Sequence, residues 1–294
     1  MVTSSNWRSV FPDSGSNIAA LSEKLTKTTN PSVYNRSVQV VGDVLFFMVR
    51  EGLERKLIVV GDDATTARFS GAVEQVNDYQ VQVCPLTTQN RIALQSIFGW
   101  LVPQACGKQK ASIGLGDRLG LATPGHIATV RNRSVMPILA QQSIRELDLT
   151  GRNYTEVLDA AAWAVLQEGY TDGYGADGDH LKRIDDVKMA LELGFSMITL
   201  DCSEHINDLA GSYSDSEVDE HYRQLDPELR RHFETTYLNQ TFALASGSKI
   251  TFTADNFRKM ILVYVNALDF AAEVYKTIIK PTDRDIDFEM SIDE

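Results

Sequence analysis

Residues 173–182 combine, within ten positions, the side-chain types that transfer protons and bind metal ions. The stretch reads Gly-Tyr-Gly-Ala-Asp-Gly-Asp-His-Leu-Lys and holds Asp177, Asp179, His180 and Lys182. Each of these polar groups costs free energy when it is buried without a partner, so a hydrophobic core has no use for the mixture. Carboxylate, imidazole and amine together suit general acid–base catalysis or metal binding.

The three glycines of this stretch also have the spacing of the dinucleotide fingerprint GxGxxG, with Asp201 where a ribose-binding acid would follow. Residues 166–172 before them do not form an apolar strand, and Asp177 and Asp179 would repel a pyrophosphate. The fingerprint is therefore weak, and glycines that only allow a tight turn explain it as well. Asp177-Gly178-Asp179 also resembles the start of a calcium-binding loop, but the later ligands of an EF-hand are missing. A solvated Asp179–His180 loop pair is the plain structural alternative.

Charge and composition exclude several classes of protein. The 294 residues carry a formal net charge of −12, which argues against a nonspecific nucleic-acid partner because phosphate backbones attract basic patches. We find no signal peptide at the N-terminus and no stretch of ~18 uninterrupted apolar residues, so no membrane span is expected. Three widely spaced cysteines suit a reducing compartment. We therefore expect a cytoplasmic globular protein.

Residues 1–106 are expected to form a small α+β N-terminal region. Its β-rich runs lie at residues 38–49, 56–61, 69–73 and 79–83. Asp62-Asp63 and Asn77-Asp78 have the composition of turns. The region carries no cluster of catalytic residue types.

Strands and helices alternate in the second expected region, residues 107–294. Expected strands lie at 111–116, 135–140, 173–175 and 195–202, and expected helices at 124–131, 154–168 and 185–194. Mostly helical sequence at about 205–280 interrupts this rhythm, with a charged, solvent-facing stretch at 218–236 and a long amphipathic helix at 254–279. A final strand is expected at 284–294. Such alternation predicts an α/β fold with βα units around a parallel sheet.

Polar residues follow the expected strands at their carboxyl ends, where parallel α/β folds bind ligands. These residues are Asp117, Arg118, Gln141, Gln142, those at 177–182 and 201–205, Asp293 and Glu294. Amide and guanidinium groups at 141–145 suit recognition of hydroxyl and carboxylate groups. An ordinary surface ion pair of Arg145 with Glu146 fits the sequence equally well. We therefore expect the site at this edge of the sheet.

Four motifs in order resemble the tagaturonate/fructuronate epimerase family. They are GDRLGLATPGHI at 116–127, QQSIREL at 141–147, GADGDHLK at 175–182 and ITLDCSEHI at 198–206, and FEMSIDE at 288–294 fits a fifth. The resemblance is strong over about 110–205 and 284–294 and loose in the N-terminal region. It implies a partial TIM-like (β/α) barrel and a metal-dependent epimerase that interconverts D-tagaturonate and D-fructuronate at C4.

The resemblance also implies a chain truncated at its C-terminus. Family members are longer, and this sequence shows about five barrel strands where eight close a barrel. The remaining metal ligands, which we expect to be histidines, would lie beyond residue 294. The implied partner is a small-molecule sugar acid, and the implied cofactor is a divalent metal cation. A homo-oligomer is compatible with this family.

The substrate constrains the mechanism, because the C4 hydrogen of a 2-keto acid sugar is not acidic by simple enolisation. Inversion at C4 needs either transient oxidation by a nicotinamide or retro-aldol cleavage of the C3–C4 bond, rotation and re-addition. The weak nucleotide fingerprint favours the second route. A divalent cation would then stabilise the C2 enolate as a Lewis acid. A nicotinamide-dependent oxidoreductase or epimerase and a non-catalytic remnant are the alternatives.

For the retro-aldol route we assign roles to seven residues. Asp179 is the expected base, Glu294 the opposing acid and His180 a metal ligand. Lys182 is expected to bind the substrate anion, or to form a Schiff base in an aldolase-like alternative. Gln142, Asp177 and Asp201 are expected to bind the substrate.

Overall fold

The computed structural model describes residues 6–14, 17–61, 63–108 and 111–292. Its internal contacts divide the chain into two compact units. Unit 1 comprises Met1–Leu181, Asp185–Ile198 and Arg284–Asp287, and unit 2 comprises Lys182–Ile184, Thr199–Asp283 and Phe288–Glu294. In the described part of the chain, no helix has both the length and the apolar character needed to cross a membrane.

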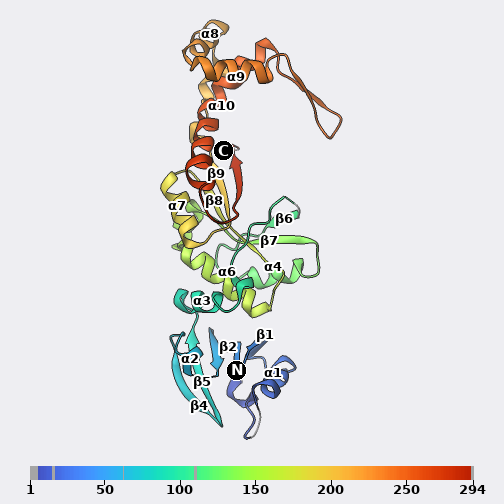
Figure 1. Ribbon diagram of the computed structural model, residues 1–294, viewed down its shortest axis with the longest axis vertical. Helices are drawn as coiled ribbons and strands as arrows, with labels where there is room; N and C mark the ends of the chain where they lie inside the picture. Colours follow the sequence, from blue (N-terminus) through green and yellow to red (C-terminus); the bar gives the residue numbers. More distant parts are fainter. Residues whose placement is uncertain (1–5, 15–16, 62, 109–110, 293–294) are drawn as a thin grey trace. The chain divides into compact units, whose positions relative to one another are not determined.

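Unit 1 begins with an antiparallel sheet in the strand order β1-β2-β3-β5-β4 (Figure 1). Its strands are β1 (Val33–Val41), β2 (Val44–Glu51), β3 (Glu54–Val60), β4 (Ala72–Val76) and β5 (Tyr79–Pro85). A turn at Gly42, whose φ of 56° suits glycine, divides the expected run 38–49 into β1 and β2. The α+β character of this region and the turn at Asn77-Asp78 are confirmed.

Two expectations for this sheet are wrong in detail. Asp63 does not lie in a turn but begins the short helix α2 (Asp63–Thr66), while Asp62 falls outside the described residues. The strand expected at 69–73 begins only at Ala72. Gly71 before it approaches β5 closely, since a Cβ on Gly71 would sit 2.5 Å from the carbonyl oxygen of Val83. The short helices η1 (Trp7–Val10) and α1 (Ile18–Thr26) supply apolar side chains to the core of this sheet.

The second five-stranded sheet has the order β12-β9-β8-β7-β6, with β6, β7 and β8 parallel. Its strands are β6 (Ala111–Gly114), β7 (Val135–Ser143), β8 (Gly175–Leu181), β9 (Met197–Asp201) and β12 (Asp287–Ser291). The helices between them are α4 (Thr123–Val130), α5 (Ile144–Thr150), α6 (Tyr154–Glu168) and α7 (Ile184–Leu193). The predicted βα alternation and the α/β class are therefore confirmed.

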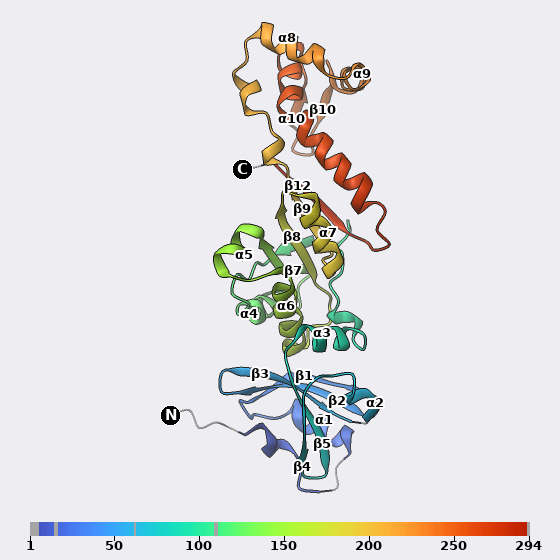
Figure 2. The ribbon, with the colours of Figure 1, turned by 90° about the vertical axis from the view of Figure 1, so that its left-hand side faces the viewer.

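Helix α6 joins the two sheets within unit 1, since it packs against both β1 and β7 (Figure 2). A capping box between Asn153 and Glu156 starts it, and Gly169 in the left-handed conformation ends it. Helix α3 (Thr88–Gln95) and the short η2 (Gly99–Leu101) lie against it, with Arg91 bound to Asp159 at 2.5 Å. Burial on two sides explains why residues 160–166 of this helix are all apolar.

Unit 2 is mostly helical, as expected. Its elements are η3 (Ser203–His205), η4 (Asp208–Ser212), α8 (Asp215–Gln224), α9 (Pro227–Tyr237), β10 (Thr241–Ala243), β11 (Lys249–Thr251), α10 (Ala254–Val274) and the π-helical turn η5 (Tyr275–Ile279). The stretch 218–236 does not simply face solvent: Val218, Tyr222 and Phe233 are buried in one apolar cluster with Phe257 of α10. The strand expected at 284–294 is the shorter β12.

Candidate functional site

The reactive stretch is itself a strand, not a loop after one. We expected a short strand at 173–175, but β8 runs from Gly175 to Leu181 and contains Asp177, Asp179 and His180. Glycine and aspartate have low strand propensity, and that propensity is overridden here because β8 lies between β7 and β9 in the sheet. Asp177 is fully buried, and Asp179 and His180 are partly exposed near the carboxyl end of the strand.

The glycines of β8 serve close packing. A Cβ on Gly175 would sit 2.4 Å from the Cδ1 of Ile138, and one on Gly178 would sit 2.9 Å from the Cδ1 of Leu181. A dinucleotide fingerprint instead needs its glycines in the turn between a strand and a helix. Because two of the three glycines lie inside β8, the required setting for phosphate binding is not present at this stretch.

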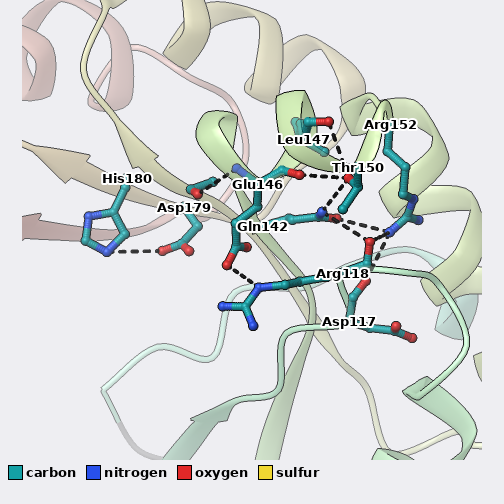
Figure 3. Close-up of polar contacts among 10 residues, drawn as sticks. Asp117, Arg118, Gln142, Glu146, Leu147, Thr150, Arg152, Asp179 and His180 are labelled. Atoms are coloured by element: carbon teal, nitrogen blue, oxygen red, sulfur yellow. Dashed lines mark hydrogen bonds and ion pairs between the residues drawn. The ribbon is translucent and has the colours of Figure 1, made fainter.

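Asp179 and His180 point toward one another, although neighbours on a regular strand face opposite sides. The backbone of His180 has a φ of 53°, in the left-handed region that non-glycine residues rarely adopt. This breaks the alternation, and the His180 Nε2 lies 3.8 Å from the Asp179 Oδ1 (Figure 3). Backbone outliers of this kind gather at functional sites, because the surrounding fold must hold them.

One face of the sheet carries polar side chains on two neighbouring strands, β7 and β8. Asp177 is the register partner of Gln141, whose Nε2 donates a hydrogen bond to the Asp177 Oδ2 at 3.5 Å. On the next strand, a Cβ on Gly114 would sit 2.4 Å from the Oε1 of Gln141, so the glycine leaves room for the amide. Gln141 and Asp177 thus form a fixed polar pair beside Asp179.

Gln142, which we expected to bind substrate, is fully buried and faces the other side of β7. Its Nε2 donates to the carbonyl oxygen of Arg118 and to the Thr150 hydroxyl, each at 3.3 Å, and its Oε1 accepts from Arg152 Nη1 at 3.0 Å. Both ends of the amide are therefore used inside the protein. The structure brings Gln141, not Gln142, to the face that carries Asp177.

Arg152 is a residue that the sequence analysis missed. Its Nη1 donates to the carbonyl oxygens of Asp117 and Arg118 at 3.0 and 3.1 Å, and its Nη2 donates to that of Glu156 (Figure 3). Its position between Gly151 and the α6 cap, Asn153, was the only sequence signal. Arg152 thereby fixes the segment that follows β6.

Asp117 reinforces the same segment as a loop anchor. Its carboxylate accepts hydrogen bonds from the amides of Leu121 and Thr123 and from the Thr123 hydroxyl, at 3.0, 2.8 and 2.7 Å. Burial raises the pKa of Asp117, but these hydrogen bonds outweigh it and hold the pKa below its usual value. Asp117 is therefore ionised and structural.

Glu146 pairs with Arg118 in place of its sequence neighbour Arg145. The Arg118 Nε donates to the Glu146 carboxylate, which belongs to the first turn of α5. Ser143 caps that helix by accepting from the Glu146 amide. The ion pair therefore joins the segment after β6 to the helix after β7, as Figure 3 shows.

Unit 2 holds a second polar group, at the end of β9. Asp201 is 1% exposed and accepts hydrogen bonds from the Ser203 amide at 2.8 Å and the Ser203 hydroxyl at 2.5 Å. The Lys182 Nζ lies 3.5 Å from Asp201 and 3.5 Å from Glu204. Burial raises the pKa of Asp201, but Ser203 and Lys182 together hold it below its usual value.

A metal site is not complete among the residues that the structure describes. No three His, Cys, Asp or Glu side chains come together there as metal ligands. The imidazole of His180 and the carboxylate of Asp179 have the donor types that divalent cations bind. Two donors do not fill a coordination shell, so the described residues alone do not fit the metal. Glu294 lies outside the described residues.

Alternating strands and helices with polar side chains at the carboxyl edge of a parallel sheet define an α/β protein of the kind that binds small molecules. A tagaturonate epimerase family model, UxaE, matches residues 34–294. The chain belongs to that family.

Relatives of known name agree with the family match. The chain is 35% identical over 263 residues to the tagaturonate/fructuronate epimerase of Thermotoga maritima, covering 89% of this chain and 53% of that protein. It is 47% identical to a glycerol-complexed fructuronate-tagaturonate epimerase UxaE from Cohnella laeviribosi, with a TM-score of 0.84, covering 89% and 52% of the two chains. To the native crystal structure of that enzyme the chain is 46% identical, with a TM-score of 0.84, covering 93% of this chain and 55% of that one. The chain spans about half the length of these relatives.

Proposed function

We propose that this chain forms the part of a tagaturonate/fructuronate epimerase that holds the proton-transfer groups for C4 inversion. The observation that carries the proposal is the Asp179–His180 pair, 3.8 Å apart on a strand of the family's sheet. The strand order and the structural likeness to the Cohnella laeviribosi enzyme support a partial (β/α) barrel at 107–294, after an N-terminal region ending near residue 106.

The proposed chemistry is a retro-aldol cleavage followed by aldol addition. Asp179 takes the proton of the C4 hydroxyl, the C3–C4 bond breaks, and its electron pair becomes the enolate of C2 and C3. The C4 aldehyde turns over, C3 adds to its other face, and an acid returns the proton to the C4 oxygen. Glu294 is the proposed acid. Asp177, Lys182 and Asp201 are the other proposed substrate-binding groups, whereas the amide of Gln142 is already used inside the protein.

Asp179 is suited to the base role by its position. It is partly exposed on β8, whereas Asp177 is fully buried beside Gln141 and Asp201 is held by Ser203 and Lys182. A base must reach the hydroxyl proton within hydrogen-bond distance, which an accessible carboxylate does more readily than a buried one. The neighbouring imidazole can stabilise the carboxylate or hand its proton on.

The proposal is tested by incubating the chain with D-fructuronate in D₂O and following D-tagaturonate by NMR. The C4–H bond is never broken in the retro-aldol route, so the product should carry no deuterium at C4. Asp179→Asn should abolish turnover, while Asp172→Asn, an exposed position shortly before β8, should leave it unchanged. Deuterium at C4, or normal turnover by Asp179→Asn, would contradict the mechanism. No turnover by the unaltered chain would contradict the activity.

We also propose dependence on a divalent cation, with His180 as one of its ligands. Elemental analysis of the purified protein and removal of metal by a chelator address this directly. His180→Ala should lower the metal content, whereas His232→Ala in α9 should not. Full activity after complete chelation would exclude the metal.

A further inference from the structure

We infer that Arg118 is the receptor for the carboxylate of the sugar acid and determines the choice of a uronate over a neutral ketohexose. The inference rests on the proposed function, since it names a specificity-determining residue for that reaction. It starts from the charge of the site. Asp177 and Asp179 are both carboxylates on β8, so an anionic substrate needs a cation beside them.

Two other cations near these strand ends, Arg152 and Lys182, already have partners within the protein. Both terminal nitrogens of Arg152 donate hydrogen bonds within the protein. Nη1 donates to the carbonyl oxygens of Asp117 and Arg118 and to the Gln142 amide, and Nη2 donates to the carbonyl oxygen of Glu156. In unit 2, Lys182 lies 3.5 Å from each of two carboxylates, which balance its charge. Neither residue offers a free fork of donors to a carboxylate.

Arg118 does offer such a fork. Its Nε donates to Glu146, whereas among the described residues Nη1 and Nη2 donate no hydrogen bond. The side chain is 71% exposed, although its carboxylate partner is only 18% exposed. Two parallel N–H groups in a rigid plane match the two oxygens of a carboxylate, and such bidentate pairs are both strong and specific.

The backbone of Arg118 is held unusually firmly for an exposed residue. Its carbonyl oxygen accepts hydrogen bonds from Gln142 Nε2 at 3.3 Å and from Arg152 Nη1 at 3.1 Å. Glu146 then fixes the plane of the guanidinium from α5. A guanidinium fixed at both its base and its Nε loses less conformational freedom when it binds a ligand, which favours binding. This also gives the buried Gln142 a positioning role.

The spacing of the strands that lead to Arg118 and contain Asp179 fits a hexuronate. Neighbouring strands lie ~4.8 Å apart, so β6 and β8, on either side of β7, are about 10 Å apart. The C4 hydroxyl and the C6 carboxylate are separated by two carbon–carbon bonds, and a hydrogen bond of about 2.8 Å at each end brings the span to roughly the same length.

The test compares the affinities of D-tagaturonate and the neutral ketose D-tagatose for the full chain, measured by isothermal titration calorimetry. Arg118→Gln should weaken D-tagaturonate binding by about 10- to 100-fold, the usual range for losing a charge-assisted hydrogen-bonded pair. Arg118→Lys should recover only part of it, because lysine keeps the charge and loses the fork. The matched control is Arg231→Gln, which removes an equal charge from an exposed position of α9 and should bind like the unaltered chain.

The outcomes separate the two proposals. If the unaltered chain prefers D-tagaturonate over D-tagatose and Arg118→Gln keeps that preference, the inference is overturned and the proposed function stands. If Arg118→Gln and Arg231→Gln weaken binding equally, only the overall charge matters and the inference is again overturned. If the unaltered chain binds neither sugar, the proposed function fails and the inference fails with it. A circular dichroism spectrum of each variant confirms that the fold is retained.

Discussion

The Lys182 ammonium lies 3.5 Å from the buried carboxylate of Asp201 and equally close to Glu204. Burial alone would lower the pKa of Lys182, but these two negative charges outweigh it and hold the pKa above its usual value. A lysine forms a Schiff base through its neutral amine, which such a shift disfavours. The geometry therefore favours Lys182 as a cation that compensates Asp201, and it disfavours the aldolase-like alternative.

We accordingly predict that Lys182 forms no Schiff base with the substrate. Incubation with D-tagaturonate and sodium cyanoborohydride should leave the mass of the chain unchanged, because a protonated amine does not attack a carbonyl. Intact-protein mass spectrometry checks this, with an aldolase of the Schiff-base class as the positive control. An adduct that disappears in Lys182→Arg would restore the aldolase-like route.

Asp117 should make the free energy of unfolding depend on pH in the acidic range. Its pKa is lowered by folding, so its contribution is complete above the unfolded pKa of about 3.9 and is lost as the pH falls through the lower folded pKa. Asp117→Asn should lower the free energy of unfolding by about 2 kcal/mol at pH 7. Below pH 4 the variant should lose less of its remaining stability than the unaltered chain does. Urea unfolding from pH 2 to 7 measures both. The exposed Asp148→Asn should change neither.

The ion pair that ties α3 to α6 should be important for stability. Arg91 and Asp159 are 7% and 16% exposed in their side chains and bond at 2.5 Å. Arg91→Ala should lower the free energy of unfolding by about 3 kcal/mol, because it leaves a poorly solvated carboxylate without its counter-charge. Lys27→Ala, which breaks an exposed pair with Glu23, should cost no more than about 0.5 kcal/mol. Equal costs in urea unfolding would contradict this assignment.

Gly169 should tolerate no side chain. It ends α6 with a φ of 53°, and a Cβ there would sit 2.2 Å from the carbonyl oxygen of Arg36 in β1. Gly169→Ala should therefore destabilise the chain by roughly 4 kcal/mol or prevent its folding. Gly151 ends α5 with a φ of 64° and open space around it, so Gly151→Ala should cost only about 1 to 2 kcal/mol. The difference between the two thermal midpoints isolates the contact between α6 and β1.

The sequence was sufficient to predict the elements that local physics controls. The helix at 154–168, the turn at Asn77-Asp78 and the alternation of strands and helices all follow from propensity and periodicity, and the structure confirms them. The motifs at 116–127, 141–147, 175–182 and 198–206 were sufficient to indicate the family, which the match over residues 34–294 confirms.

Tertiary structure decided which polar residues share a face and which are available. Composition alone placed residues 177–182 in a loop, and only pairing with neighbouring strands makes most of them part of β8. Gln141 and Gln142 are indistinguishable by type, yet strand alternation sends them to opposite faces. Arg118 became a candidate receptor only when Arg152 and Gln142 were found to hold its backbone while Glu146 orients its side chain. Residue types are local properties, whereas partners and exposure depend on chain segments that meet only after folding.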